Sequence, residues 1–310
     1  MDFLFNWLAN IPPFAVPYAL AALGLMICEK SGVLNLGAEG FLLVGALAGV
    51  GAILSAGASP AAALGIAMLA TAALSLLFAV MVIALRVNQV ISGLAIVFLA
   101  QGLTSLLGRT QGWTSRSFSG MPRIEIPWLS DLPWVGRILF SQDPVFYLTL
   151  VLIVFAAWAL RNTHVGMRLR SVGENPEAAD AAGIPVALYR FGAVVLGAAL
   201  MGLAGGYLTV VISNIWVDNI TGGRGWIVIA LVIFARWQPL AALAGAVLFG
   251  GIEAVIPRLA ATGFWVPQHF LLMLPYLLTL GVMVWSSLAR RGRGGGPAAL
   301  GDPFLREERR

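Results

Sequence analysis

The sequence has 310 residues, of which 59% are hydrophobic and only 11% are charged. This composition excludes an ordinary soluble domain and indicates a polytopic membrane protein built from apolar helices. The formal net charge of +5 does not indicate nucleic-acid binding, because the arginines lie between apolar runs and in the C-terminal tail instead of on one basic face. The single cysteine, Cys28, excludes an intrachain disulfide and a thiolate metal cluster.

Nine apolar runs are long enough to cross, or nearly cross, a hydrocarbon core about 30 Å thick. They fall at about residues 14–28, 40–57, 61–85, 90–108, 144–160, 191–213, 225–235, 239–256 and 269–287. The seventh run is short for a complete crossing, and residues 29–39 are polar although apolar runs flank them closely. We therefore predict an all-α transmembrane domain over residues 1–287, with about eight to ten membrane helices of which one or two are broken.

Lysine and arginine are distributed unequally between the two sides that these runs define. The larger share of the 19 basic residues falls on the side of the loop at 162–190 and of the tail at 288–310. The positive-inside rule therefore places this loop and the C-terminus in the cytoplasm, and the loop at 109–143 outside. The tail is rich in glycine and arginine and is expected to be disordered. Residues 1–14 are expected to lie flat at the membrane interface as a short amphipathic helix.

One segment, which begins at Asn175 and ends at Gly183, is typical of a short helix exposed to water. Asn175 can cap the helix, and Pro176 suits its first position. Glu177 and Asp180 place negative charge near the positive end of the helix dipole. Because a helix this short is marginal alone in water, we predict that another protein chain holds it.

The residues expected of an enzyme are missing from the sequence. The only lysine, Lys30, lacks the glycine spacing of a phosphate-binding loop around it, so the chain is not expected to bind ATP. His164 and His269 are in no metal-binding spacing, and no Gly-x-Ser-x-Gly motif occurs. We therefore expect no catalytic residue, no metal and no cofactor in this chain, and any ATP and magnesium would be used by a partner.

The stretch from Ser31 to Gly40 interrupts the membrane pattern with glycines, Asn35 and Glu39. Non-helical backbone at membrane depth is tolerated only where it is buried in protein or faces water. If this stretch is intramembrane, Glu39 is a candidate for the path of a solute. The alternative is a cytoplasmic turn, with Glu39 at a helix start where it favours the helix dipole.

A second break covers residues 218–226. Gly222 and Gly225, followed by Trp226, echo the spacing of Gly37 and Gly40 before Phe41, and the predicted topology puts the two breaks on opposite sides of the membrane. Two broken helices that meet near a central path are typical of an inverted repeat. A chance match between two glycine turns is the alternative.

Other polar residues in or beside the apolar runs are further candidates for such a path. Amides could bind hydroxyls or a heterocyclic edge of a polar solute, and a carboxylate should face protein or water. For the amides, hydrogen bonding between helices is the alternative. The candidates are Asn35, Glu39, Asn88, Gln89, Ser92, Gln101, Arg224, Trp226 and Glu253.

Five stretches resemble, in order, the permease subunits of bacterial ATP-binding-cassette importers that serve branched-chain amino acids, ribose and nucleosides. They are Glu29 to Gly40, Asn88 to Leu94, Gly173 to Gly183, Gly223 to Trp226 with Phe234 to Pro239, and Leu274 to Leu280. The first two are similar to the nucleoside and simple-sugar group, and the third is similar to the coupling motif Glu-Ala-Ala-x-x-x-Gly. Lys30 stands where arginine is usual, which leaves the charge intact.

The resemblance implies a type II importer fold in the bacterial inner membrane and uptake of nucleosides, above all purine nucleosides, or of related simple sugars. It implies a heterodimer with a second permease subunit, two ATPase subunits and an extracytoplasmic binding protein. The residues that it assigns to ATPase coupling are Glu174, Asn175, Pro176, Glu177, Ala178, Ala179, Asp180 and Gly183.

Two other functions stay open at this point. A secondary transporter would need an ion-coupling carboxylate deep in the membrane, for which Glu39 and Glu253 are the only candidates. A structural or assembly protein of the membrane would carry no solute, and the polar breaks would then have no use.

Overall fold

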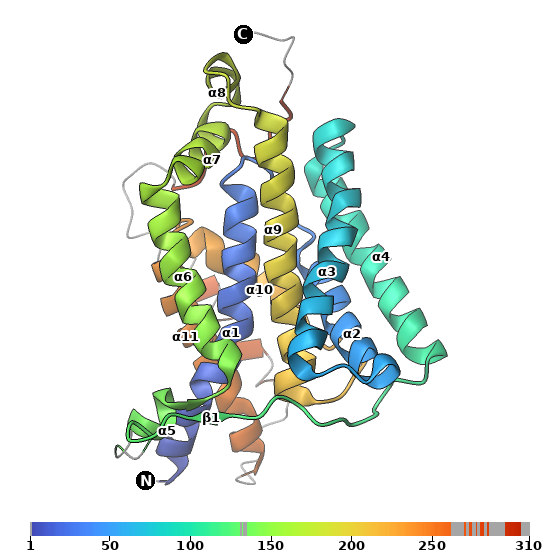
Figure 1. The fold of residues 1–310 in the computed structure, drawn as a ribbon, viewed down its shortest axis with the longest axis vertical. Coiled ribbons are helices and arrows are strands. Elements are labelled where there is room, and N and C mark those ends of the chain that lie inside the picture. Colours follow the sequence, from blue (N-terminus) through green and yellow to red (C-terminus); the bar gives the residue numbers. More distant parts are fainter. Residues whose placement is uncertain are drawn as a thin grey trace.

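The computed structural model describes residues 2–130, 132, 135–261, 270, 273, 274, 277, 280, 281, 284 and 295–304. Long helices make up most of it (Figure 1). In chain order the helices are α1 (Asp2–Glu29), α2 (Ala38–Ala56), α3 (Pro60–Ala79), α4 (Gln89–Thr110), α5 (Val135–Leu139), α6 (Pro144–Asn162), α7 (His164–Glu174), α8 (Pro176–Ala181), α9 (Val186–Tyr207), α10 (Arg224–Phe234) and α11 (Pro239–Ala261). The π-helical turns Val80–Ala84 and Leu208–Ser213 extend α3 and α9, and β1 (Ile124–Glu125) pairs antiparallel with β2 (Ser141–Gln142).

Seven helical runs among the described residues are long and apolar enough to cross a membrane, and α10 is a shorter apolar helix of 11 residues. The first eight predicted runs are each found as a helix, which confirms an all-α polytopic membrane protein. The short run at 225–235 corresponds to α10. The ninth run at 269–287, with His269 and the fifth of the resembling stretches, lies for the most part outside the described residues.

Helix α1 runs without interruption from Asp2 to Glu29, so residues 2–14 do not form the separate short interfacial helix that was predicted. The helix continues as one run of 28 residues in spite of three internal prolines. Each proline removes a backbone N–H, and neighbouring groups can satisfy the freed carbonyls inside a membrane. The indole Nε1 of Trp7 donates to the carbonyl of Gly251 at 2.7 Å, which holds this part of α1 against α11.

Glycines allow the central helices α1, α2 and α9 to approach one another closely. A Cβ built on Gly24 of α1 or on Gly197 of α9 would meet the carbonyl oxygen of the other glycine. Gly45 of α2 faces Gly202 of α9 in a similar way. Since lipid tails are as apolar as the side chains, this close packing is a main source of helix association in a bilayer.

The two ends of the molecule differ in structure. Figure 1 shows α7 and α8 together at one end, and α5 with β1 at the other. The predicted loop at 162–190 therefore holds two helices instead of one, because α7 was missed. Thr163 caps α7 by accepting a hydrogen bond from the Gly166 N–H at 3.1 Å. On which side of the membrane each end lies stays a prediction.

Residues 295–304 fold against the α7–α8 end and so differ from the predicted disordered tail. The Ala299 N–H donates to the Gly173 carbonyl at 3.0 Å, and the Gly301 N–H donates to the Gly32 carbonyl at 3.1 Å. These backbone bonds fix a segment whose glycine-rich composition indicates disorder. The other residues of the tail lie outside the described part of the chain.

Replacing Gly197 by leucine should lower the thermal stability of the purified protein, because the new side chain must displace the backbone of α1 at Gly24. Overpacking of this kind typically costs about 1–3 kcal/mol. The matched control is Gly192→Leu in the same helix, where a Cβ meets nothing within 4 Å. The melting temperatures are measured by size-exclusion chromatography after heating. Equal values for the two variants would contradict the close packing.

Candidate functional site: two half-helices and a polar cluster

The first break is the non-helical stretch between α1 and α2, and it lies inside the helix bundle. Helix α1 ends at Glu29 and α2 begins at Ala38. The carbonyl oxygen of Leu42, in the second turn of α2, lies against Gly205 of α9. Gly205 is about 28 Å along its helix from Val186, at 1.5 Å per residue. The first turn of α2 is therefore deep among the membrane helices, and Glu39 is not in an exposed turn.

The second break brings the start of α10 to the same place. Thr221 Oγ1 donates to Glu39 Oε1 at 2.5 Å, and the Gly223 N–H donates to the same oxygen at 2.9 Å. The Gly225 N–H donates to Glu39 Oε2 at 2.6 Å. A Cβ at Gly225 would meet the Glu39 backbone, so this approach requires glycine. The two breaks meet, as the interpretation of two broken helices predicted.

Glu39 lies between the N-termini of two helices, its own α2 and the facing α10. The unpaired N–H groups at a helix N-terminus carry partial positive charge, so each terminus stabilises a carboxylate beside it. The Glu39 side chain accepts three hydrogen bonds and the residue is only 2% exposed. This arrangement makes Glu39 an anchor between the two half-helices.

Arg224 is the first residue of α10, and it pairs with Glu253 of α11. Its Nε donates to Glu253 Oε2 at 3.2 Å, and its Nη2 lies 3.2 Å from the same oxygen. Tyr18 of α1 donates its hydroxyl to Glu253 Oε1 at 2.5 Å. The ion pair is thus hydrogen-bonded on both sides, as a charge pair inside a membrane must be, and it joins three helices.

A second polar group, which we call the amide cluster, consists of Asn35, Gln89 and Ser92. Gln89 Oε1 accepts from the Leu34 N–H at 2.6 Å, and Asn35 Oδ1 accepts from the Gly37 N–H at 2.8 Å. Ser92 follows Gln89 by one turn on the same face of α4. All three residues are buried. Their remaining polar atoms, Asn35 Nδ2, Gln89 Nε2 and Ser92 Oγ, make no regular hydrogen bond in the part of the chain that the structure describes, although the Asn35 side chain lies beside the Cys28 thiol.

The other three predicted path residues lie outside both groups. Asn88 caps α4, because its Oδ1 accepts from the N–H groups of Val90 and Ile91 at 3.0 and 3.1 Å. Trp226 is 40% exposed, and Gln101 is half-buried on α4. The structure therefore brings six of the nine candidates into two groups and gives Asn88 a local role in its own helix.

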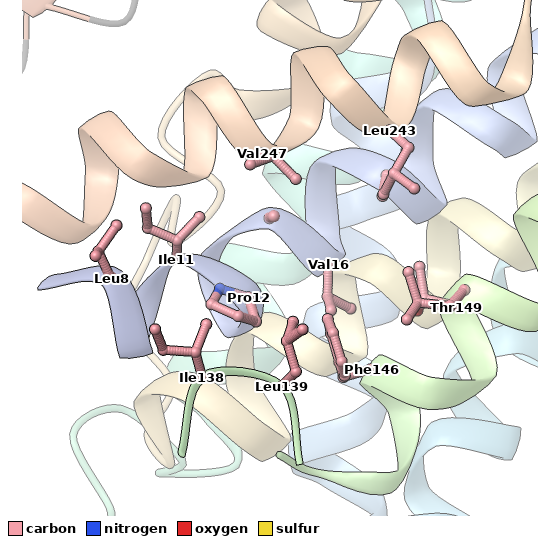
Figure 2. A pocket seen from close by; sticks show the side chains of 13 residues that line it. Leu8, Ile11, Pro12, Val16, Ile138, Leu139, Phe146, Thr149, Leu243 and Val247 are labelled. Atoms are coloured by element: carbon pink, nitrogen blue, oxygen red, sulfur yellow. The ribbon is translucent and has the colours of Figure 1, made fainter. Parts of the chain in front are cut away.

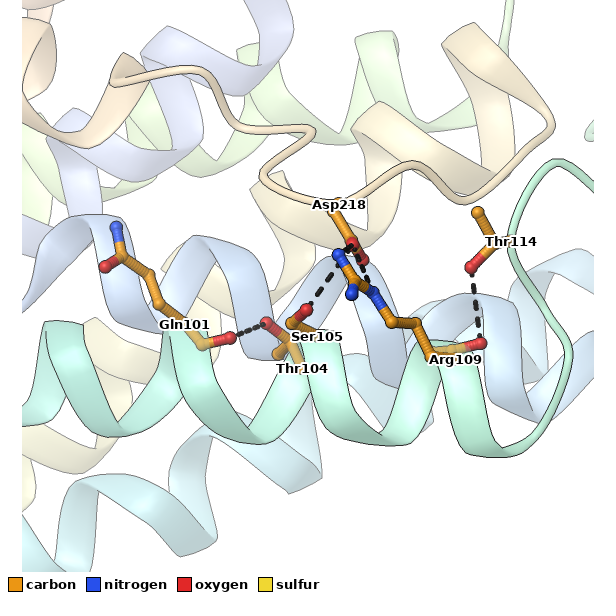
Figure 3. Close-up of polar contacts among 7 residues, drawn as sticks. Gln101, Thr104, Ser105, Arg109, Thr114 and Asp218 are labelled. Carbon is orange, nitrogen blue, oxygen red and sulfur yellow. Dashed lines mark hydrogen bonds and ion pairs between the residues drawn. The ribbon is translucent and has the colours of Figure 1, made fainter.

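Figure 3 shows an ion pair on α4 that the sequence analysis did not predict. Arg109 donates from Nε and Nη2 to Asp218 Oδ2 at 2.9 and 2.7 Å, and Ser105 Oγ donates to the same oxygen at 3.4 Å. The pair ties the end of α4 to the second break. Because the Arg109 side chain is 73% exposed, its contribution to stability is small.

The segment predicted to couple to an ATPase has the predicted local structure. Asn175 Oδ1 accepts from the Ala178 N–H at 2.9 Å, Pro176 is the first residue of α8, and Gly183 has a φ of 80°. Ala179 is buried, whereas Glu177 is exposed. The short helix therefore rests on its own chain with one face and presents the other.

The coupling segment touches the C-terminal segment and the first break. Phe304 packs against the apolar cluster formed by Val172, Ala179 and Val186. The Ala298 N–H donates to Glu174 Oε2 at 3.3 Å. Gly173 lies against the backbone of Lys30, at the start of the first break. Burial, together with the charge of nearby arginines, lowers the pKa of the Lys30 amine.

Figure 2 shows an apolar pocket of about 310 Å³ between α1, α5, α6 and α11. Leu8 and Val16 of α1, Phe146 of α6 and Val247 of α11 are among its lining residues. The described residues that line it include no charged side chain and only one hydroxyl, that of Thr149. Such a wall offers little to a polar solute, so the pocket does not compete with the two polar groups as the functional site.

Several residues of the site were missed. Glu29 is 2% exposed, and its Oε2 accepts from the Trp237 Nε1 at 2.6 Å. Both residues stand in stretches that carry the resemblance, which was the available signal. A tyrosine within an apolar run needs a partner for its hydroxyl, so Tyr18 could have been expected beside Glu253 or Glu39. Thr221 gave no signal of its own.

Broken helices whose N-termini meet inside a bundle of apolar helices are typical of multi-pass membrane transport proteins. Residues 7–283 match the family model described as branched-chain amino acid transport system, permease component, and the chain belongs to this family of permeases. This confirms the resemblance found in the sequence.

Three curated relatives illustrate the family. A putative glucose ABC transporter permease protein of Haloferax volcanii is 40% identical over 76% of this chain and 72% of its own length. The guanosine ABC transporter permease protein of Bacillus subtilis is 35% identical over 96% of this chain and 95% of its own length. A nucleoside ABC transporter permease protein of Lactococcus lactis is 31% identical over 89% of this chain and 90% of its own length. These matches do not favour a secondary transporter.

Changing Glu39 to glutamine should lower the melting temperature of the purified protein strongly. The three donors now bind two carboxylate oxygens, whereas an amide offers them only one acceptor oxygen. A hydrogen bond to a charged group contributes about 1.5–3 kcal/mol. Thr221→Val removes one of the three donors and should have a smaller effect of the same sign. Glu125→Gln, at an exposed site, is the control. A Glu39→Gln variant as stable as the control would contradict the anchor.

Proposed function

We propose that this chain is the permease subunit of an ATP-driven importer for nucleosides, above all purine nucleosides, or for related simple sugars. The observation that carries this proposal is the match over nearly its full length to relatives named as guanosine and nucleoside permeases. A relative named as a glucose permease supports the sugar alternative. The chain itself contributes no catalytic residue, and ATP and magnesium are used by its partner ATPase.

The exposed face of α8 supports the proposed site of ATPase coupling. Glu177 and Ala178 are exposed on this capped helix, whose other face is held by its own chain, and Glu174 is exposed at the end of α7 just before it. A helix presented in this way fits into a groove of a partner protein without first having to fold. The contact between Gly173 and Lys30 then leads from the coupling segment into the first break.

The proposed assembly contains a second permease subunit, two ATPase subunits and an extracytoplasmic binding protein. The proposed location is the bacterial inner membrane, with the loop at 162–190 and the C-terminus in the cytoplasm and the loop at 109–143 outside. The hydrogen bond between residues 295–304 and α7 supports placing the loop at 162–190 and the C-terminus on the same side of the membrane. The solute path is proposed to pass the half-helix junction, where Glu39 of α2 meets the N-terminus of α10, and then the amide cluster. Gln101 and Trp226 are proposed to lie further along it.

Changing Glu177 to arginine should leave the protein folded in the membrane and abolish ATP-driven uptake, because the exposed carboxylate would be replaced by the opposite charge at the ATPase contact. Uptake and ATP hydrolysis are measured with the purified importer in proteoliposomes, and co-purification of the ATPase is measured on the same samples. Uptake is expected to fall at least tenfold, the factor that corresponds to about 1.4 kcal/mol of lost binding.

The control for this variant is Glu125→Arg, the same change at an exposed site at the other end of the molecule. It should retain both the ATPase and uptake. Normal uptake by Glu177→Arg would remove the coupling assignment. Uptake by the wild type that collapses with a protonophore while ATP stays high would instead favour a secondary transporter.

A further inference from the structure

The two amide groups of the amide cluster have fixed orientations. Their oxygens accept backbone N–H groups of the first break, those of Gly37 for Asn35 and of Leu34 for Gln89. A backbone N–H can be met only by the oxygen of a carboxamide, because its nitrogen carries donors alone. The NH₂ groups therefore point away from these bonds. On their free sides both side chains offer only hydrogen-bond donors.

Ser92 is exceptional among the buried hydroxyl groups of the described residues. The other buried serine and threonine hydroxyls each donate a hydrogen bond, namely those of Ser31, Thr71, Ser75, Thr104, Thr149, Thr209 and Thr221. Ser92 Oγ has no partner in this part of the chain, although the residue is 0% exposed. Leaving three such groups of the first break and α4 without a partner among the described residues lowers stability, and a native protein that keeps them requires an explanation.

The place of the cluster suggests that explanation. A Cβ on Gly93, the residue after Ser92, would lie 3.0 Å from the Leu36 N and 3.1 Å from the Gly37 N, so α4 is pressed against the first break. The same break touches the coupling segment at Lys30 and precedes the half-helix junction at Glu39. A shift of this break would open the space beside the three unpaired groups.

We propose that the amide cluster is a binding site, closed in this structure, that receives two neighbouring hydrogen-bond acceptors of the transported solute. The inference deepens the proposed function and depends on it. Among nucleosides the 6-oxopurines fit, because O6 and N7 are adjacent acceptors, whereas adenine places an N6 amino donor beside N7. The Asn35 and Gln89 amides bind the two acceptors, and Ser92 adds a hydroxyl. A 6-aminopurine leaves one amide facing another donor.

The first experiment replaces Ser92 by alanine and measures stability and transport on the same preparation. Removing an unpaired buried hydroxyl should raise the melting temperature of the purified importer. The same change should raise the KM for uptake of inosine or guanosine about fivefold, the factor that corresponds to one neutral hydrogen bond. Ser75→Ala, which removes a buried hydroxyl that has a partner, is the control and should not raise the melting temperature.

The second experiment replaces Gln89 by glutamate, which keeps the oxygen that accepts from the Leu34 N–H and removes the NH₂ group. Competition by unlabelled nucleosides gives the selectivity for inosine over adenosine in proteoliposomes that contain the complete importer. The binding protein is the same in every sample, so a changed ratio reports on the permease. The ratio should fall for Gln89→Glu and stay unchanged for Gln111→Glu, at an exposed site on the end of α4.

The results distinguish a cluster that binds the solute from one that has only a structural role. A Ser92→Ala variant that is more stable and transports normally, with an unchanged ratio in Gln89→Glu, shows that water or packing occupies the cluster and overturns the proposal. A wild-type importer that carries a simple sugar and no nucleoside overturns the assignment of 6-oxopurines and leaves the permease function standing. A wild type that carries neither class of solute in the presence of its ATPase removes the proposed function itself.

Discussion

The Glu39 carboxylate is the contact on which both breaks depend. A helix that begins inside a membrane leaves backbone N–H groups without partners, and an unpaired polar group in apolar surroundings costs several kcal/mol. Here α2 and α10 present their N-termini to one carboxylate, whose buried oxygens in turn need hydrogen-bond donors. Each break therefore lowers the desolvation penalty of the other. A solute path lined by broken helices requires such an anchor, because otherwise the breaks would refold as continuous helices or expose backbone to lipid.

A continuous series of contacts leads from the exposed face of α8 to this anchor. Ala179 of α8 belongs to the apolar cluster against which Phe304 packs. The C-terminal segment is bonded to Gly173 and Gly32, and the first break runs from there to Glu39. These contacts show that α8 and Glu39 are physically connected. They would couple the two sites energetically only if changes at either site shifted the same conformational equilibrium. The first break is the element that can take this part, because it carries non-helical backbone between two rigid helices.

Hydropathy and local chemistry could predict the spans, the capped helix at Asn175 and the position of both breaks. These features depend on residues close together in the sequence, such as Pro176 after its cap. The partner of Arg224 could not be predicted, since Glu39 and Glu253 were equally acceptable carboxylates and only the packing of α10 on α11 selects one. The same holds for the C-terminal segment, whose bonds are made by backbone groups and leave no trace in composition. The orientation of the Asn35 and Gln89 side chains could likewise not be predicted, because it depends on backbone N–H groups that the fold brings beside them.

The two polar groups of the site differ in one respect that separates anchoring from binding. The charged residues are saturated, because Glu39 accepts three hydrogen bonds and Glu253 is held by Arg224 and by Tyr18. An ion-coupling carboxylate must exchange its partner during every cycle, which a saturated anchor resists. The neutral amide cluster has the opposite property, since its donors are buried and have no hydrogen-bond partner among the described residues. Neutral donors can bind and release an uncharged solute without exposing a charge to lipid, so the amide cluster is better suited than the charged residues to the solute binding that we propose.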